Sequence, residues 1–255
     1  MRRIYQTTWH GIPFDSFADL SSTVLADTQF YHAFYRVFFE KYKHSGELNP
    51  DWVRLKLETI SRLHDKIFPS KKTRILSVGC GLGFQEKALL GLGYSELEVT
   101  EVSEHPLKWI RPHLAGDRIH VGLFPSCLPA DRWYDSILLA GIDVFFDETQ
   151  WVEFLREVRA RLNRMGNCTM ISWTLEHEGP LLRSMTKMKA WARQALETLH
   201  IRHRGQFWGY TRTRQEYRAA FLHAGFTNLT DETIDTGTQW LTYRLTGSEG
   251  YAEAE

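Results

Sequence analysis

Residues 75–83 read Ile-Leu-Ser-Val-Gly-Cys-Gly-Leu-Gly, an apolar run that leads straight into a loop with glycine at Gly79, Gly81 and Gly83. Residues 85–92 have helical character, so the loop joins a strand to a helix, and its backbone can pass close to a nucleoside cofactor. A dinucleotide-binding loop needs glycine at its sixth position, which here is Phe84. The Lys-Ser/Thr ending of a P-loop is also missing. The stretch therefore predicts a nucleoside site of another kind.

Alternating strand and helix patterns continue on both sides of this loop. After it we expect strands at 97–100, 119–121 and 134–141, a helix whose apolar face runs from Trp151 to Leu162, and a strand at 168–173. A helix beginning near Thr213 and two strands, 228–233 and 240–245, complete the series. Before the loop, residues 1–70 are expected to be helical. Phe30, Tyr31, Phe34, Tyr35 and Phe38 form one stripe, and a helix capped by Asn49 carries Val53, Leu57, Ile60, Leu63 and Ile67 inward.

The loop and the order of elements together resemble the class I S-adenosylmethionine-dependent methyltransferases. The first motif of that family is an apolar strand followed by Gly-x-Gly-x-Gly, and the resemblance covers about residues 70–246. It implies a Rossmann-like, mostly parallel α/β sheet of seven strands with helices on both faces, an antiparallel last strand and an N-terminal helical cap. It also implies a cap at 1–70, a core at 71–246 and an acidic, disordered tail at 247–255. S-adenosylmethionine would be the cofactor and S-adenosylhomocysteine the product.

Glu101, at the end of the second core strand, is the residue to which the resemblance gives the cofactor ribose. A carboxylate suits this task because it accepts both hydroxyl protons at once. The alternative is a solvated acid at a strand end, and in either case we expect an exposed side chain that contributes little to folding. The resemblance places the remaining cofactor contacts at Gly79, Cys80, Gly81, Gly83, Val102, Phe124, Ala140 and Gly141.

Two positions depart from the family pattern. Most members carry Asp two residues before the first glycine, where it supports the methionine amino group, and this chain has Ser77. The acid that usually follows the third strand is also missing, since the chain reads Gly-Leu-Phe-Pro at 122–125. These departures keep open a methyltransferase-like binding or scaffold protein without turnover. A finer similarity is to the histamine N-methyltransferase type of small-molecule enzyme.

Aromatic residues are the candidates for the substrate pocket. Tyr31 and Tyr35 would close the open edge of the sheet, and Trp173, Trp208 and Tyr210 would add a wall, the last two from a loop before the final helix. Aromatic faces attract a sulfonium cation, although the same rings could simply fill the interface between cap and core. Asp143, at the exit of the fourth strand, is the candidate general base, or else a cap of the following loop. His10 and His32 are poorer candidates for the base.

The substrate class is narrowed by composition. The 255 residues carry a formal net charge of zero, so nucleic acid is not expected as a partner. A small molecule is the predicted substrate, methylated on nitrogen or oxygen, with a sugar or glycan end as the alternative because basic residues gather at 200–214. The longest apolar run, about ten residues, is too short to span a membrane. Three separated cysteines fit a cytoplasmic protein, and no metal-ligand motif is present. The oligomeric state is not predicted.

Overall fold

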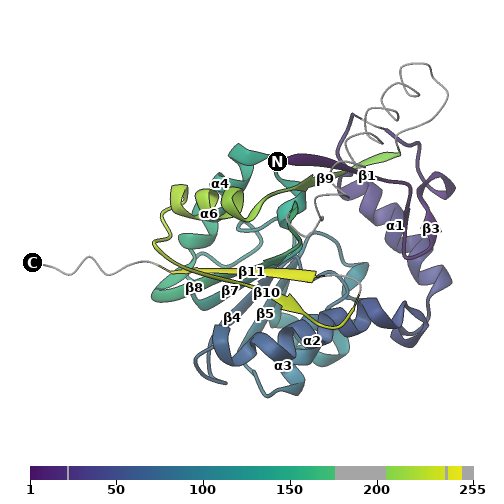
Figure 1. Cartoon of the computed structure of the whole chain (residues 1–255). Coiled ribbons are helices and arrows are strands. Elements are labelled where there is room, and N and C mark those ends of the chain that lie inside the picture. The colour runs from purple at the N-terminus through teal and green to yellow at the C-terminus, as the bar shows by residue number, and fades with distance from the viewer. Residues whose placement is uncertain (22, 176–204, 239–240, 249–255) are drawn as a thin grey trace, which may run out of the picture.

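The computed structural model describes residues 1–21, 23–175, 205–238 and 241–248. A central sheet is covered on one side by α2 (Pro50–Ile67) and α3 (Phe84–Gly91), and on the other by α4 (Glu148–Arg159) and α6 (Arg214–His223) (Figure 1). Helix α1 (Thr28–Lys41) lies at one end with the short N-terminal strands. The fold class predicted from the sequence is thereby confirmed.

Seven strands form the central sheet, in the order β10-β11-β8-β7-β4-β5-β6. Their bounds are β4 Ile75–Val78, β5 Leu97–Glu101, β6 Ile119–Val121, β7 Tyr134–Ala140, β8 Leu162–Ser172, β10 Asn228–Asp235 and β11 Leu241–Ser248. Strands β4 to β8 pair in parallel, whereas β11 lies antiparallel between β8 and β10. The order reverses between β4 and β7, so the carboxyl ends of these two strands flank the crevice in which such sheets bind ligands.

Two apolar clusters hold the helices onto the sheet. One joins β7, β8 and β11 to α4 and α6 through Trp151, Leu155, Tyr217 and Phe221. The other joins β4 and β5 to α2 and α3 through Ile60, Leu63, Leu89 and Val99. Helix α4 is shorter than predicted, because it ends at Arg159 and Leu162 already belongs to β8. On α2 the inward face was predicted with Leu57, but that side chain is exposed.

The N-terminal segment contains strands as well as helices. Strand β1 (Arg2–Gln6) pairs antiparallel with β9 (Gln206–Thr211), and β2 (Thr8–Trp9) pairs with β3 (Ile12–Pro13). Residues 206–211 were predicted to be a loop, and their strand partner lies about two hundred positions away in the sequence. Beneath these strands, Phe14, Phe34 and Phe38 are fully buried in a cluster that also holds Trp208. The predicted boundary at residue 70 stays a prediction. The tail was predicted to begin at residue 247, but residues 247–248 still belong to β11. Residues 249–255 lie outside the described residues.

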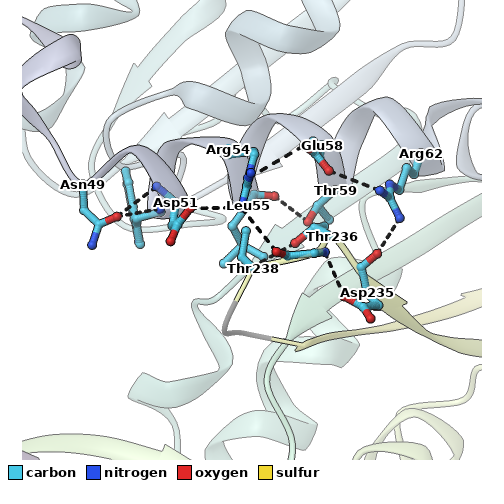
Figure 2. Close-up of polar contacts among 12 residues, drawn as sticks. Asn49, Asp51, Arg54, Leu55, Glu58, Thr59, Arg62, Asp235, Thr236 and Thr238 are labelled. Atoms are coloured by element: carbon cyan, nitrogen blue, oxygen red, sulfur yellow. Dashed lines mark hydrogen bonds and ion pairs between the residues drawn. The ribbon is translucent and has the colours of Figure 1, made fainter.

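Helix α2 is tied to the connection between β10 and β11 by polar contacts on its outer face (Figure 2). Asn49 caps the helix by accepting hydrogen bonds from the backbone N–H groups of Asp51, at 2.9 Å, and Trp52, at 3.3 Å. Arg54 donates to the carbonyl of Gly237 at 3.3 Å, and Arg62 donates to that of Asp235. These contacts fix the position of α2 relative to the sheet.

Candidate functional site

The glycine loop turns sharply between β4 and α3. Gly79, Gly81 and Gly83 have φ values of 67°, 56° and 74°, in the left-handed region that favours glycine. A Cβ atom on Gly79 would lie 2.5 Å from the side chain of Ile142, and one on Gly83 would lie 2.4 Å from Ile110. Of the described residues, a Cβ on Gly81 would meet only the Tyr35 hydroxyl, at 3.8 Å. Gly79 and Gly83 therefore pack against protein, whereas the space over Gly81 is open.

Glu101 lies directly beneath this loop. One carboxylate oxygen accepts a hydrogen bond from Gly81 N–H at 2.8 Å, and the other accepts one from Val102 N–H at 2.9 Å. The residue is only 8% exposed, which contradicts the expectation of an exposed, energetically neutral acid. Burial raises the pKa of Glu101, and the N–H donors oppose this shift. A carboxylate has about four lone-pair sites, so these backbone donors do not exhaust its capacity to accept a ligand hydroxyl.

A cavity of about 560 Å³ opens above the loop. Every residue predicted to contact the cofactor lines it: Gly79, Cys80, Gly81, Gly83, Glu101, Val102, Phe124, Ala140 and Gly141. Phe124 packs against Phe154 with ring centroids 5.4 Å apart, and Phe154 stacks on Phe146 at 4.6 Å. These rings give the cavity an apolar wall after β6, on the side where the sequence has no acid.

A second aromatic wall comes from the N-terminal segment, β9 and the segment after β7. The ring of Tyr31 lies 5.3 Å from that of Phe145 and 5.4 Å from that of Trp208, and Trp9 lies 5.1 Å from Trp208. All four side chains line the cavity. The Tyr31 hydroxyl is buried and has no hydrogen-bond partner among the described residues, so it is available to a ligand.

The other three predicted substrate residues are placed differently. Tyr35 lines the cavity on the side of the glycine loop, because its hydroxyl lies close to Gly81. Burial raises the pKa of Tyr35, and the charge of Glu101 raises it further. Trp173 follows β8 and is 38% exposed. Tyr210 packs edge-on against Phe207, 5.2 Å away. Neither Trp173 nor Tyr210 is among the described residues of the cavity wall.

Asp143 is fully buried and is not among the described residues that line the cavity. Its carboxylate accepts hydrogen bonds from Ser172, at 2.8 Å, and from the Tyr217 hydroxyl, while its backbone carbonyl accepts one from Arg212 at 2.9 Å. Burial raises its pKa, and the two hydroxyl donors oppose that shift. These contacts join the exit of β7 to β8, β9 and α6. Both hydroxyls reach the same oxygen, Oδ2, and the other, Oδ1, is buried with no partner among the described residues. The contacts give Asp143 a structural role, and its role as general base stays a prediction.

The remaining basic and histidine candidates do not form a substrate grip within the described part of the chain. Arg212 is buried, and it donates to the backbone carbonyls of Asp143, Phe146 and Asp147. Residues 200–204 of the basic run lie outside the described residues. His10 packs against Trp52, and burial, followed by the charge of Lys56, lowers its pKa to about 4. His32 is exposed.

Sequence reasoning missed three charged residues of the cavity wall: Asp27, which caps α1, Lys56 on α2 and Glu86 on α3. Glu86 is buried, and it accepts a hydrogen bond from Ser77. Lys56 could have been found from the sequence, because it lies on the same helix stripe as Ile60, Leu63 and Ile67. An unpaired charge on a buried stripe is costly, so a lysine there indicates a functional role. Trp9, from the short strand β2, is also part of the wall.

No group of three His, Cys, Asp or Glu residues that could hold a metal ion occurs in the described ranges. Within the same ranges, none of the helices has the length and apolar character needed to cross a membrane.

Searches against protein-family models and against curated proteins find no match to this sequence. Solved structures do match. Magnesium protoporphyrin IX methyltransferase from Synechocystis PCC 6803, solved with S-adenosylhomocysteine, aligns with a TM-score of 0.60 and 11% identity over 88% of this chain and 96% of that one. This chain has the class I methyltransferase fold.

Two further structures with this fold are similar. A Nostoc punctiforme protein described as a candidate O-methyltransferase gives a TM-score of 0.58 at 15% identity, and human N-acetylserotonin methyltransferase, solved with S-adenosylmethionine, gives 0.51 at 18%. Each covers 89% of this chain, which in turn spans 63% of the Nostoc protein and 61% of the human one. The class I methyltransferase fold places the cavity at the carboxyl ends of β4, β5 and β7, the edge at which open α/β sheets bind ligands.

Proposed function

We propose that this protein is an S-adenosylmethionine-dependent methyltransferase that acts on a nitrogen or oxygen atom of a small molecule. One observation carries the proposal: Glu101, the open face over Gly81 and the Tyr31–Trp208 wall all belong to a single cavity. The solved methyltransferase structures that hold S-adenosylmethionine or S-adenosylhomocysteine support the choice of cofactor.

The cavity fits an adenosine group. Glu101 offers two acceptor oxygens for the ribose hydroxyls, Phe124 and Phe154 offer apolar faces for the base, and the backbone at Gly81 allows close approach. When bound, S-adenosylmethionine supplies a methyl group on sulfur that is already activated for displacement. The chain then has to hold the acceptor atom in line with that methyl group and exclude water.

The second aromatic wall suits a flat, largely apolar acceptor. This wall offers aromatic edges and faces from Tyr31, Phe145, Trp9 and Trp208. The Tyr31 hydroxyl, which has no partner in the described part of the chain, can orient one polar atom of the acceptor. Of the described lining residues, Lys56 alone is a cation, and it lies on α2 rather than on this wall. The second aromatic wall therefore offers no described cation to bind a sugar or glycan end that carries an anionic group. Since Asp143 has other partners, we propose an acceptor that arrives without a proton to lose, or loses it to solvent.

Calorimetry and a turnover assay together test this proposal. The protein should bind S-adenosylhomocysteine and S-adenosylmethionine and should not bind NAD. Release of S-adenosylhomocysteine from S-adenosylmethionine, measured over a panel of aromatic amines and phenols, then separates an enzyme from a binding protein. Gly81→Val serves as the matched control that should neither bind nor turn over. Binding of NAD alone would contradict the proposed function.

A further inference from the structure

Two opposite charges face the cavity next to the glycine loop, and the adenosine contacts leave them unused. Lys56 enters from α2 and Glu86 from the first turn of α3, and both line the cavity. Burial lowers the pKa of Lys56, while the charges of Glu86 and Asp143 oppose that shift, so the lysine and Glu86 lie within electrostatic reach of each other. Charged groups are seldom kept in such a place unless something pairs with them.

Glu86 is held in place from below by Ser77. The Ser77 hydroxyl donates to one carboxylate oxygen, Oε1, and Glu86 is 1% exposed. Ser77 stands two residues before the first glycine of the loop and is itself buried. A serine at this position therefore does not leave the cavity without an acid, because it orients the Glu86 carboxylate that the adjoining helix supplies to the wall.

Lys56 is placed by the helix that carries it. It precedes Ile60, Leu63 and Ile67 on the inward stripe of α2, and these three are buried against the sheet. The outer stripe of α2 is tied to the β10–β11 connection by Arg54 and Arg62 (Figure 2). Among the described residues the Lys56 ammonium lies over the ring of Trp52, 5.7 Å from its centroid. Within the described ranges this ammonium, on a residue of the cavity wall, forms no ion pair with a carboxylate, so it can meet a ligand carboxylate.

The amino-acid end of S-adenosylmethionine carries the complementary charges, an ammonium and a carboxylate. We infer that Glu86 binds the ammonium and Lys56 the carboxylate of this group, so that the Ser77–Glu86 pair takes over the task of the missing strand-end acid. Glu101 and Glu86 also place two carboxylates around a ligand that bears ammonium and sulfonium charges, which favours the cationic cofactor. This inference rests on the proposed function, and it adds a cofactor subsite to it.

Truncated ligands test the inference by calorimetry. S-adenosylhomocysteine has both charges, S-adenosyl-3-thiopropylamine lacks the carboxylate, and 5′-methylthioadenosine lacks the whole amino-acid group. Glu86→Gln should weaken the first two by about tenfold to a hundredfold and leave the third unchanged. Lys56→Met should weaken only the first, by a similar factor. Lys66→Met, an exposed lysine on the same helix that pairs with Glu232 at 2.8 Å, is the matched control and should change none.

Each outcome of this experiment decides one question. If the wild type binds none of the ligands, the proposed function fails and the inference with it. If it binds S-adenosylhomocysteine and 5′-methylthioadenosine equally well, the function stands and the inference is overturned. Equal losses for all ligands in the variants would also overturn it, because they indicate a damaged loop. Glu86→Asp, which keeps the charge on a shorter side chain, should retain part of the selectivity and guards against misfolding of the amide variant.

Discussion

Replacement of Glu101 by alanine should remove the selectivity of this protein for an intact ribose. The carboxylate can accept one hydrogen bond from each ribose hydroxyl, and a hydrogen bond to a charged group contributes about 1.5–3 kcal/mol. Both oxygens already accept a backbone N–H, so the lower value applies to each. The sum is about 3 kcal/mol, or a loss of roughly 150-fold in affinity for S-adenosylhomocysteine.

Loss of affinity alone would not prove the contact, because Glu101 also holds Gly81 and Val102 in place. The decisive assay compares S-adenosylhomocysteine with its 2′-deoxy and 3′-deoxy analogues on the wild type and on Glu101→Ala. Any loosening of the loop weakens all three ligands alike and cancels in this comparison. The wild type should prefer the full ribose at both positions, and the variant should not. Equal discrimination by the two proteins would refute the ribose role of Glu101.

Three other substitutions test separate parts of the account. Gly81→Val puts a branched side chain at a φ of 56° and into the open space of the cavity, so binding of S-adenosylhomocysteine should vanish while circular dichroism stays native; retained affinity would place the ligand elsewhere. Burial raises the pKa of Glu86 above 4.5, although the Ser77 hydrogen bond and the charge of Lys56 oppose this shift. The protonated carboxyl group therefore stabilises the fold fully below pH 4.5, and this stabilisation is lost as the pH rises through the raised pKa. Without ligand, Glu86→Gln should therefore unfold at a higher temperature than the wild type at pH 8, with a gap that closes in acid; a gap independent of pH would count against this. Asp143→Ala removes the carboxylate that accepts from the hydroxyls of Ser172 and Tyr217. Chemical denaturation should show a free energy of unfolding lower by about 1–3 kcal/mol, and cofactor affinity should not change. A loss of affinity without a loss of stability would contradict the structural role of Asp143.

Features encoded by local signals could be predicted from the sequence. The apolar run and three glycines define β4 and its loop, and the cap at Asn49 marks the start of α2. Strand β6 spans the predicted residues 119–121. The cofactor side of the cavity follows from the same signals, since parallel strands bring their carboxyl ends to one edge.

Features that depend on residues far apart in the sequence could not be predicted. The pairing of β1 with β9 joins segments about two hundred residues apart, so Trp208 was predicted as a pocket residue but its strand was not predicted. Asp143 looked like an active-site acid from its place after β7, and only the positions of Ser172 and Tyr217 reveal its buried role. Lys56 and Glu86 converge because α2 and α3 pack on the same face of the sheet, which no spacing within either helix encodes.

A crystal structure of the protein with S-adenosylhomocysteine tests the central claim most directly. We predict the ribose hydroxyls on the Glu101 carboxylate, the adenine against Phe124, and the amino-acid end between Lys56 and Glu86. Its sulfur atom should face the wall formed by Tyr31 and Trp208. A ligand found outside this cavity, or a cavity still empty in crystals grown with saturating ligand, would contradict the account.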